Sequence, residues 1–529
     1  MKIKFLGATK TVTGSFFLLE TDSRRFAVDC GLFQGSKEIQ ERNYGDFTVD
    51  PGSIDFLILT HAHIDHTGLV PKLCKHGFKG PIYCSYATAE LSTVLLPDAG
   101  YIQEMEVERK NRKLVRAGKE EIKPIYTAED ALECLRQFQP INMDEMIELG
   151  PGIEVRLRDA GHILGSCIIE LWVIEDGKKL KLVFTGDLGN EKQPILRDPT
   201  IIENTDYLII ESTYGNRSHQ EMGDRPQRLK EVIDKTMAKG GNLIIPAFAV
   251  ERTQEVLYDL NILYQDGRLD PAIDIYIDSP LAIAATEIFE RNVDFYGDET
   301  RQMVAEGNHF LKIPNLKFSR SQQDSMLLNQ RRENTIIISA SGMCDAGRIK
   351  HHLRHNLWRR ESTVLMVGYQ SKGTLGRRLV EGEKIVTIHG EQVAVKADIE
   401  TIDAYSAHAD REGLMDWMQQ FIIMPKAVFL VHGEEEAQIS LASEIKSRFN
   451  IPIFIPDWLD EYNLKPAEEL SRTVYAGVDK NKALVAEQLY LDLRLKMNRT
   501  FAEHWDKAEY DRIIELLEDI NSSIDSKMA

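Results

Sequence analysis

Apolar and polar residues alternate in three short runs near the N-terminus, KIKFLGA, TGSFFLLET and RRFAVDCG. This period of two is typical of half-buried β-strands. Gly7, Gly14 and Asp22-Ser23 supply the turns between the runs. Residues 1–30 are therefore predicted to form a β-meander. Asp29, at the end of the third run, is expected to brace its loop, and support of a nearby functional side chain is the alternative.

A continuous apolar run at residues 56–59 predicts a buried strand, and a dense polar motif follows it at once. The motif, HAHIDH at residues 61–66, holds three imidazoles and one carboxylate. Imidazole nitrogens and carboxylate oxygens are ligands that suit Zn²⁺ and similar divalent metals. A solvated histidine-rich turn is the alternative, but such a turn does not need a buried strand before it.

The spacing within this motif separates its ligands into two sets. His61 and His63 alternate, so on an extended backbone they project to the same side. Asp65 and His66 lie where Thr67-Gly68 should turn the chain into a helix, so they can face a second ion.

Polar groups recur at the ends of three later apolar strands. His162 follows the strand pattern at 153–158, Asp187 follows 182–184, and Glu211 follows 209–210. Ligand sites of α/β architectures gather at strand ends, so these side chains are candidates for the same site.

The middle of the chain changes its pattern. Residues 88–138 are polar and helical in pattern, which predicts a solvated helical excursion. Repeated strand–turn–helix units between residues 216 and 398 predict a parallel sheet with flanking helices, in a separate domain. Strand patterns then return, and the chain meets His408 in DAYSAHAD and His432 in AVFLVHGEEE.

Length and composition agree with a multidomain soluble enzyme. The chain has 529 residues, too many for one ordinary core. It lacks a membrane-spanning run and a signal-peptide pattern, so we expect a cytoplasmic protein without a membrane partner. Its six cysteines show no C-x-x-C spacing and are expected to be reduced and buried. The net charge of −19 argues against a protein that coats nucleic acid, so a polyanionic substrate would need metal ions and a local basic groove.

In their order along the chain, these candidate ligands resemble those of the metallo-β-lactamase superfamily, in which H-x-H-x-D-H, a later His and a later Asp bind two zinc ions. The resemblance implies that His61, His63 and His162 hold one metal, that Asp65 and His66 hold the other, and that Asp187 bridges them. The implied fold is an αββα sandwich with the metals at one edge.

The complete layout resembles the β-CASP ribonucleases, which carry a second domain inserted into this sandwich and include the nuclease subunit of the eukaryotic mRNA cleavage and polyadenylation machinery. The matching motifs, in family order, are TGSFFLLE, DCGLFQG, THAHIDHTG, GHILGS, FTGDLG, ESTYG, PAFAVERTQE, DSPLA, SGM, SAHAD and LVHGE. The expected fold class is α/β. A metallo-β-lactamase domain is expected at 1–215 and 399–463, an inserted parallel α/β β-CASP domain at 216–398, and a largely helical extension at 464–529.

The same resemblance implies roles for three further residues. His432 completes the second metal site, while His408 and Glu211 form the family's active-site pair that does not bind metal. The expected activity is zinc-dependent hydrolysis of single-stranded RNA by a metal-bridging hydroxide, with endonucleolytic cleavage favoured over 5′-exonucleolytic cleavage. Asp65 would orient the water as well as ligate, and His408 would protonate the leaving 3′-oxygen. Two Zn²⁺ ions are expected, with Mn²⁺ as the alternative.

Two positive runs, at residues 347–360 and 371–378, are candidates for the RNA groove. Small residues after strands leave backbone N–H groups open to phosphate. The expected contacts with the RNA backbone are Ser341, Gly342, Lys372, Gly373, Thr374 and Arg377. A solvated amphipathic helix is the alternative for part of this charge, and no aromatic motif of the kind that reads bases is present.

Other functions remain to be weighed. A small-molecule metallohydrolase would share the metal ligands but would have no use for a large inserted domain. DNA-directed relatives tend to lack the histidine of LVHGE, and a non-catalytic RNA-binding scaffold would have lost ligands. Residues 501–520 are predicted to form an amphipathic helix that docks on the core, with a homodimer contact as the alternative.

Overall fold

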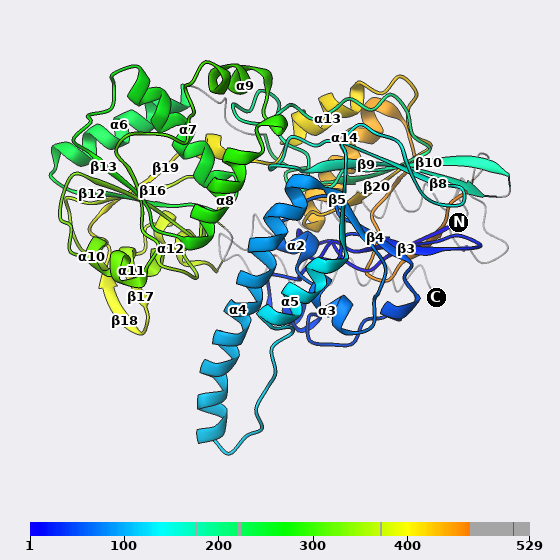
Figure 1. Cartoon of the computed structure of the whole chain (residues 1–529), viewed down its shortest axis with the longest axis horizontal. Helices are drawn as coiled ribbons and strands as arrows, with labels where there is room; N and C mark the ends of the chain where they lie inside the picture. Colours follow the sequence, from blue (N-terminus) through cyan, green and yellow to red (C-terminus); the bar gives the residue numbers. More distant parts are fainter. Residues whose placement is uncertain (176, 219–223, 371–372, 466–511, 513–529) are drawn as a thin grey trace.

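Two packed sheets and a separate third sheet make up the fold. The computed structural model describes residues 1–175, 177–218, 224–370, 373–465 and 512 (Figure 1). The two seven-stranded sheets lie on the right of Figure 1, and the six-stranded sheet of the inserted segment lies on the left. The predicted helix at 501–520, and nearly all of the extension at 464–529, lie outside the described residues.

The first sheet has the strand order β22-β1-β2-β3-β4-β5-β6. Its strands are β1 (Lys2–Phe5), β2 (Phe17–Glu20), β3 (Arg25–Val28), β4 (Phe56–Ile58), β5 (Ile82–Ser85), β6 (Phe138–Ile141) and β22 (Glu461–Asn463). Strands β1 to β3 pair antiparallel, and β3 pairs parallel with β4. The predicted meander and the predicted buried strand are both confirmed.

The second sheet has the order β21-β20-β11-β10-β9-β8-β7. Its strands are β7 (Ile147–Gly150), β8 (Ile153–Asp159), β9 (Cys167–Glu175), β10 (Lys178–Phe184), β11 (Tyr207–Glu211), β20 (Ala427–Val431) and β21 (Ile453–Phe454). Strands β10, β11 and β20 are mutually parallel neighbours. Their carboxyl ends therefore meet at one edge of the sheet.

The inner faces of these two sheets bury one apolar core. The ring centroids of Phe5 and Phe429 lie 5.3 Å apart, and those of Phe17 and Phe184 lie 5.9 Å apart, so aromatic pairs join the sheets. Helices α3 (Val70–Lys75) and α5 (Ala128–Cys134) pack outside the first sheet, and α13 (Arg411–Gln419) and α14 (Glu435–Phe449) outside the second. The predicted αββα sandwich is confirmed.

The inserted segment forms a six-stranded parallel sheet in the order β14-β13-β15-β12-β16-β19. Its strands are β12 (Asn242–Pro246), β13 (Asp274–Ile277), β14 (Leu316–Phe318), β15 (Thr335–Ser339), β16 (Thr363–Met366) and β19 (Asp398–Thr401). Because β19 pairs with β16, this sheet continues past residue 398 to Thr401.

Helices cover both faces of the inserted sheet. One face carries α6 (Arg225–Ala238), α7 (Arg252–Gln265) and α8 (Pro280–Arg291); the other carries α11 (Ile349–Asn356), α12 (Leu375–Val380) and the hairpin of β17 (Ile385–Ile388) and β18 (Glu391–Ala394). Shorter helices are α1 (Lys37–Glu41), α2 (Ile64–Thr67), α9 (Asp298–Ala305) and α10 (Gln322–Leu328). The predicted parallel α/β architecture is confirmed.

Helix α4 (Tyr86–Arg116) corrects one expectation. Its first turns bury Leu91 and Leu95 in the core of the inserted domain and contact α8, so this half is not solvated. Its second half projects from the molecule, as Figure 1 shows. The solvated helix that the polar sequence predicted is found only in the second half, because the inserted domain covers the first half.

The remaining composition-based expectations concern cysteines and membranes. All six cysteines are buried and unpaired, as predicted. Among the described helices, none is long and apolar enough to cross a membrane.

Candidate metal centre and active site

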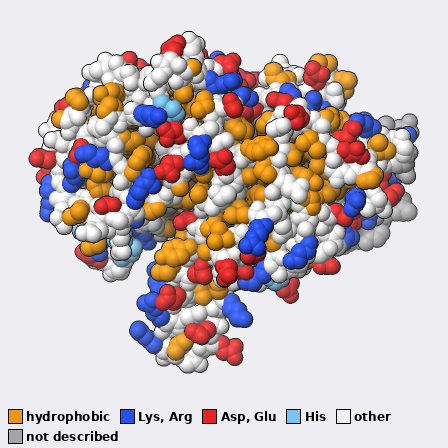
Figure 2. All heavy atoms as spheres, viewed as in Figure 1, with side chains coloured by type: hydrophobic (Ala, Val, Ile, Leu, Met, Phe, Trp, Pro, Cys, Tyr) orange, Lys and Arg blue, Asp and Glu red, His pale blue; other side chains and the backbone are white. Residues whose placement is uncertain are grey.

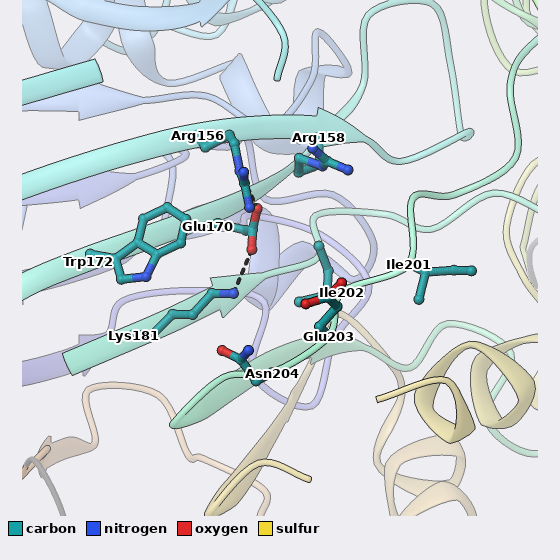
Figure 3. Close-up of a pocket in the computed structure, with 9 residues that line it drawn as sticks. All are labelled: Arg156, Arg158, Glu170, Trp172, Lys181, Ile201, Ile202, Glu203 and Asn204. Atoms are coloured by element: carbon teal, nitrogen blue, oxygen red, sulfur yellow. Dashed lines mark hydrogen bonds and ion pairs between the residues drawn. The ribbon is translucent and has the colours of Figure 1, made fainter. Parts of the chain in front are cut away.

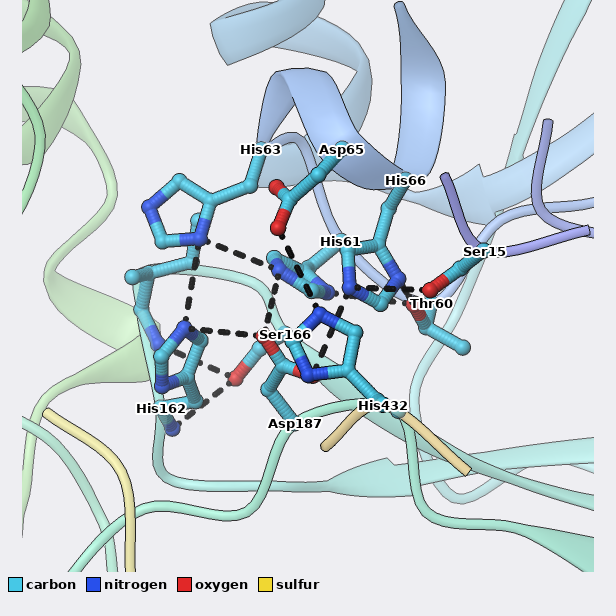
Figure 4. Close-up of polar contacts among 12 residues, drawn as sticks. Ser15, Thr60, His61, His63, Asp65, His66, His162, Ser166, Asp187 and His432 are labelled. Carbon is cyan, nitrogen blue, oxygen red and sulfur yellow. Dashed lines mark hydrogen bonds and ion pairs between the residues drawn. The ribbon is translucent and has the colours of Figure 1, made fainter. Parts of the chain in front are cut away.

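Histidines and aspartates from several strand ends converge at one edge of the sandwich (Figure 4). His61 and His63 follow β4, His162 lies between β8 and β9, Asp187 follows β10, and His432 follows β20. The parallel strands β10 and β20 flank β11, which brings Asp187 and His432 to the same edge.

The first set of ligands surrounds a space of the size of a metal ion. His63 Nδ1 lies 3.1 Å from His61 Nε2 and 3.2 Å from His162 Nε2. Asp187 Oδ2 lies 3.5 Å from the Nε2 atoms of both His61 and His162. Ligand atoms about 2.0–2.1 Å from a tetrahedral Zn²⁺ are themselves about 3.3 Å apart, so these four atoms have suitable spacing.

The protonation of this first set also suits a cation. Burial lowers the pKa of His61 and His162 well below the ordinary value and lowers the pKa of His63 to about 4. His162 Nδ1 donates to the carbonyl of Ala407 at 3.2 Å, so its Nε2 lone pair points into the cluster. Neutral imidazoles with converging lone pairs are the form that binds a metal.

The second set consists of Asp65, His66 and His432. His432 Nε2 lies 3.4 Å from Asp65 Oδ2, and His66 Nε2 lies 3.4 Å from Asp187 Oδ1. Burial opposes charge on Asp65, but the hydrogen bond from His432 and the nearby imidazoles lower its pKa to about 2. Burial also opposes charge on His66, but Asp187 and Asp29 raise its pKa well above the ordinary value. This set therefore favours positive charge, which a bound cation would supply in place of a proton.

Asp187 joins the two sets. Its Oδ2 faces the first set, while its Oδ1 faces His66 at 3.4 Å and His432 Nδ1 at 3.5 Å. Burial would raise the pKa of Asp187, but the surrounding histidines hold it well below the ordinary value. Its Oδ1 is buried and accepts no hydrogen bond from the described residues. A buried carboxylate oxygen that accepts no hydrogen bond is costly, and a cation on each side of this carboxylate would reduce the cost.

For Asp29, the sequence pattern favoured bracing of its loop, with support of a nearby functional side chain as the alternative. Its Oδ1 accepts from the backbone N–H of Thr60 at 2.8 Å, and its Oδ2 accepts from Thr60 Oγ1 at 2.9 Å. The same Oδ2 lies 2.8 Å from His66 Nδ1. Asp29 thus braces the loop and also orients His66, with Nε2 of that ring directed at the cluster.

His408 and Glu211 form a second pair of interacting side chains beside the candidate metal ligands. His408 Nδ1 lies 3.3 Å from both carboxylate oxygens of Glu211 and 3.9 Å from Asp187 Oδ2. Burial lowers the pKa of His408, but Glu211 and Asp187 outweigh it and raise the pKa to about 9. Glu211 is fully buried, whereas the His408 side chain is 21% exposed. A charged imidazole with an exposed edge can donate a proton to a bound substrate.

The predicted RNA contacts lie on two adjoining loops of the inserted domain. Ser341 and Gly342 follow β15, and the backbone N–H of Gly376 donates to the carbonyl of Met343 at 3.1 Å, which ties this loop to the start of α12. The Thr374 side chain accepts from the N–H of Arg377 and caps α12.

The remaining members of this predicted set differ in what the structure shows. The guanidinium of Arg377 pairs with Glu381 at 2.7 Å, so its charge is already compensated. Gly373 is exposed next to Thr374. Lys372 lies outside the described residues. On the face shown in Figure 2, positive and negative side chains are interspersed.

A separate cavity of about 430 Å³ lies on the outer face of the second sheet (Figure 3). Within it, Glu170 pairs with Arg156 at 2.7 Å and with Lys181 at 2.6 Å, which compensates most of the buried charge. None of its lining residues belongs to the histidine cluster. We therefore assign the chemistry to the histidine cluster.

Three family profiles match consecutive parts of the chain. They are the metallo-beta-lactamase superfamily at residues 10–231, the Beta-Casp domain at 253–379, and the Zn-dependent metallo-hydrolase RNA specificity domain at 392–456. In chain order, the three profiles cover the first part of the sandwich, then the inserted domain, and then the part of the chain that returns to the sandwich.

Curated relatives match nearly the same length. A ribonuclease of Thermus thermophilus is 35% identical over 85% of this chain and 96% of its own. The transcription termination factor FttA of Methanosarcina mazei is 32% identical over 85% of this chain and 70% of its own. A solved structure of an Enterococcus faecalis protein of unknown function has a TM-score of 0.50 and 12% identity, over 87% of this chain and 99% of that one, which bears on the fold alone.

Proposed function

Because this chain belongs to the β-CASP family of metallo-β-lactamase hydrolases, we propose that it is a two-zinc ribonuclease that cleaves single-stranded RNA endonucleolytically. The observation that carries the proposal is the position of Asp187. One of its oxygens faces three histidines, and the other, which accepts no hydrogen bond within the described part of the chain, faces a second set of ligands. Such a bridging carboxylate is suited to a dinuclear centre.

Seven residues would hold the two ions: His61, His63 and His162 at the first, Asp65, His66 and His432 at the second, and Asp187 between them. Two bound zinc ions would acidify a water molecule and neutralise charge on the phosphoryl oxygens. Asp65 is 20% exposed and stays ionised, so its carboxylate can accept a hydrogen bond from the attacking water and orient it.

His408 would complete the reaction by protonating the leaving group. Its imidazolium is held by Glu211, and its exposed edge would give a proton to the 3′-oxygen as the P–O3′ bond breaks. Attack by water on the phosphorus leaves a 5′-phosphate on one product and a 3′-hydroxyl on the other. The inserted domain beside this edge is consistent with a polymeric substrate, which a small-molecule hydrolase of the same fold would not require.

Metal analysis combined with cleavage of end-labelled oligonucleotides tests the proposal. We expect about two zinc ions per chain, as a two-metal site requires, and cleavage of single-stranded RNA in preference to DNA of the same sequence. Internal fragments with 5′-phosphates should appear at the earliest times. Stepwise shortening from the 5′ end would support the exonuclease alternative, and intact RNA with hydrolysed thioesters or lactones would refute a ribonuclease.

A further inference from the structure

Arg217, at the rim of the active site, has no counter-charge among the residues that the structure describes. Its side chain is exposed, and it forms no ion pair with any carboxylate in the described part of the chain. By contrast, Arg411, whose backbone N–H donates to the carbonyl of Arg217 at 3.1 Å, pairs with Glu412 at 3.0 Å. In a protein of net charge −19, an unpaired arginine at this position calls for an anionic partner.

Two tyrosines from different domains hold this guanidinium. The Arg217 Cζ lies 5.5 Å from the ring centroid of Tyr214 and 5.2 Å from that of Tyr369. The two rings are themselves 6.5 Å apart and nearly perpendicular. The Nε of Arg217 donates to Asn216 Oδ1 at 3.4 Å. The two Nη atoms of an arginine placed over aromatic rings stay available, so they can still bind a phosphate with two hydrogen bonds.

The position of this cluster relates it to catalysis. The ring of Tyr214 lies 5.8 Å from the ring of His408, edge on. Tyr214 follows β11 of the sandwich, and Tyr369 follows β16 of the inserted domain, so Arg217 spans the boundary between the domains next to the proton donor.

The strand order of the inserted sheet places further candidate RNA contacts in line with this position. Strands β15, β12 and β16 are neighbours, and their carboxyl ends lead to Gly342, Phe248 and Tyr369 respectively. Phe248 is 42% exposed, and a Cβ on Gly342 would lie 2.9 Å from its ring, so the ring rests on this glycine. An exposed ring of this kind can stack a base of single-stranded nucleic acid without reading its sequence.

We propose that Arg217 binds a backbone phosphate of the RNA next to the bond that is cleaved, and that Phe248 stacks a base farther along the same strand. The inference rests on the proposed ribonuclease function and adds a binding subsite to it. Arg217 acts in binding, so it should affect affinity and not the rate of cleavage at saturation.

The test measures affinity for a labelled oligoadenylate by fluorescence anisotropy over a salt series, together with the single-turnover cleavage rate, on the zinc-loaded protein. R217Q should weaken binding about ten-fold or more and reduce the salt slope by about one, with the saturated rate unchanged. R217K keeps the charge but loses the planar fork, so it should lie between R217Q and the unaltered protein. F248L should weaken binding about five-fold or more without changing the salt slope.

R112Q is the matched control because it removes the same charge from the projecting half of α4, and it should bind as the unaltered protein does. Unaltered affinity and salt slope in R217Q would overturn the inference, as would a reduced saturated rate at unchanged affinity. These results would leave the ribonuclease function intact. If the unaltered protein neither binds nor cleaves RNA, the proposed function fails, and the subsite fails with it.

Discussion

The substitution D29N separates the two roles that the structure gives to Asp29. The asparagine side chain could still accept from the N–H of Thr60 through its oxygen, so the loop would keep that contact. Its amide nitrogen would then replace Oδ2, which now accepts from Thr60 Oγ1 and lies 2.8 Å from His66 Nδ1. Since an amide nitrogen can only donate, His66 Nδ1 would have to accept from it through its lone pair. The ring proton would then lie on Nε2.

That change of tautomer would disable His66 as a ligand in the second set. Loss of a hydrogen-bonding partner behind a metal-bound histidine typically weakens metal affinity about 10–100-fold, or about 1.4–2.7 kcal/mol. Asp29 contacts no ligand of the first set directly. Its nearest link to that set is Thr60 Oγ1, which lies 3.1 Å from His61 Nδ1, so the affinity of the first set should change less. We therefore expect D29N to lose one of two zinc ions at a chelator concentration that leaves the unaltered protein fully loaded.

The assay is zinc content after dialysis against graded chelator, with thermal unfolding to check that the fold persists. D55N is the control because Asp55 also accepts from a backbone N–H, that of Arg25 at 2.8 Å, but precedes β4 at the end of the sheet away from the metals. Equal zinc retention by D29N and D55N would show that Asp29 only braces the loop.

Three further predictions concern the active-site residues, the pH dependence of stability and the C-terminal extension. H408A should keep its zinc but lose roughly 10²–10⁴-fold in single-turnover RNA cleavage, whereas D187A should lose zinc as well. In the metal-free protein the raised pKa of His408 stabilises the fold most below pH about 6.5 and ceases to do so as pH rises through about 9, so the advantage over H408Q in urea unfolding should shrink across that range. Truncation after Lys465 should lower the oligomer mass measured by light scattering if the extension builds a homodimer, and an unchanged mass would exclude that role.

Local patterns predicted the parts of the site that lie at the ends of strands. The apolar run before His61 and His63 indicated both the strand and the placement of its ligands, because a strand of this kind ends at the edge of a sheet. No local pattern could bring His432 to Asp65, since the two are 367 positions apart and meet only because β20 pairs with β11 and the two sheets pack together. That part of the prediction depended on the family resemblance.

Two other outcomes show what the sequence pattern lacked. The role of Asp29 depends on the parallel pairing of β3 with β4, which sets Asp29 beside Thr60, and this pairing is a tertiary contact. The charge of Arg377, by contrast, is compensated by Glu381 four residues later on the same helix. This spacing is visible in the sequence and argues for weighing each positive residue against its neighbours at i+4.

The point of insertion places the added domain next to the candidate metal site. Strand β11 ends at Glu211, the chain then runs through the inserted domain, and it returns through His408 to β20, which pairs with β11 along its whole length. The two residues of the proposed proton-donating pair therefore flank the insertion. The hydroxyl of Tyr405, just before His408, donates to Asp259 of α7 at 2.7 Å, and Arg225 of α6 binds the same carboxylate at 2.6 Å. His408 thus contacts Glu211 of the sandwich and lies three residues after Tyr405, which this buried network ties to the inserted domain. A shift of one domain against the other would therefore change the position of the proposed proton donor.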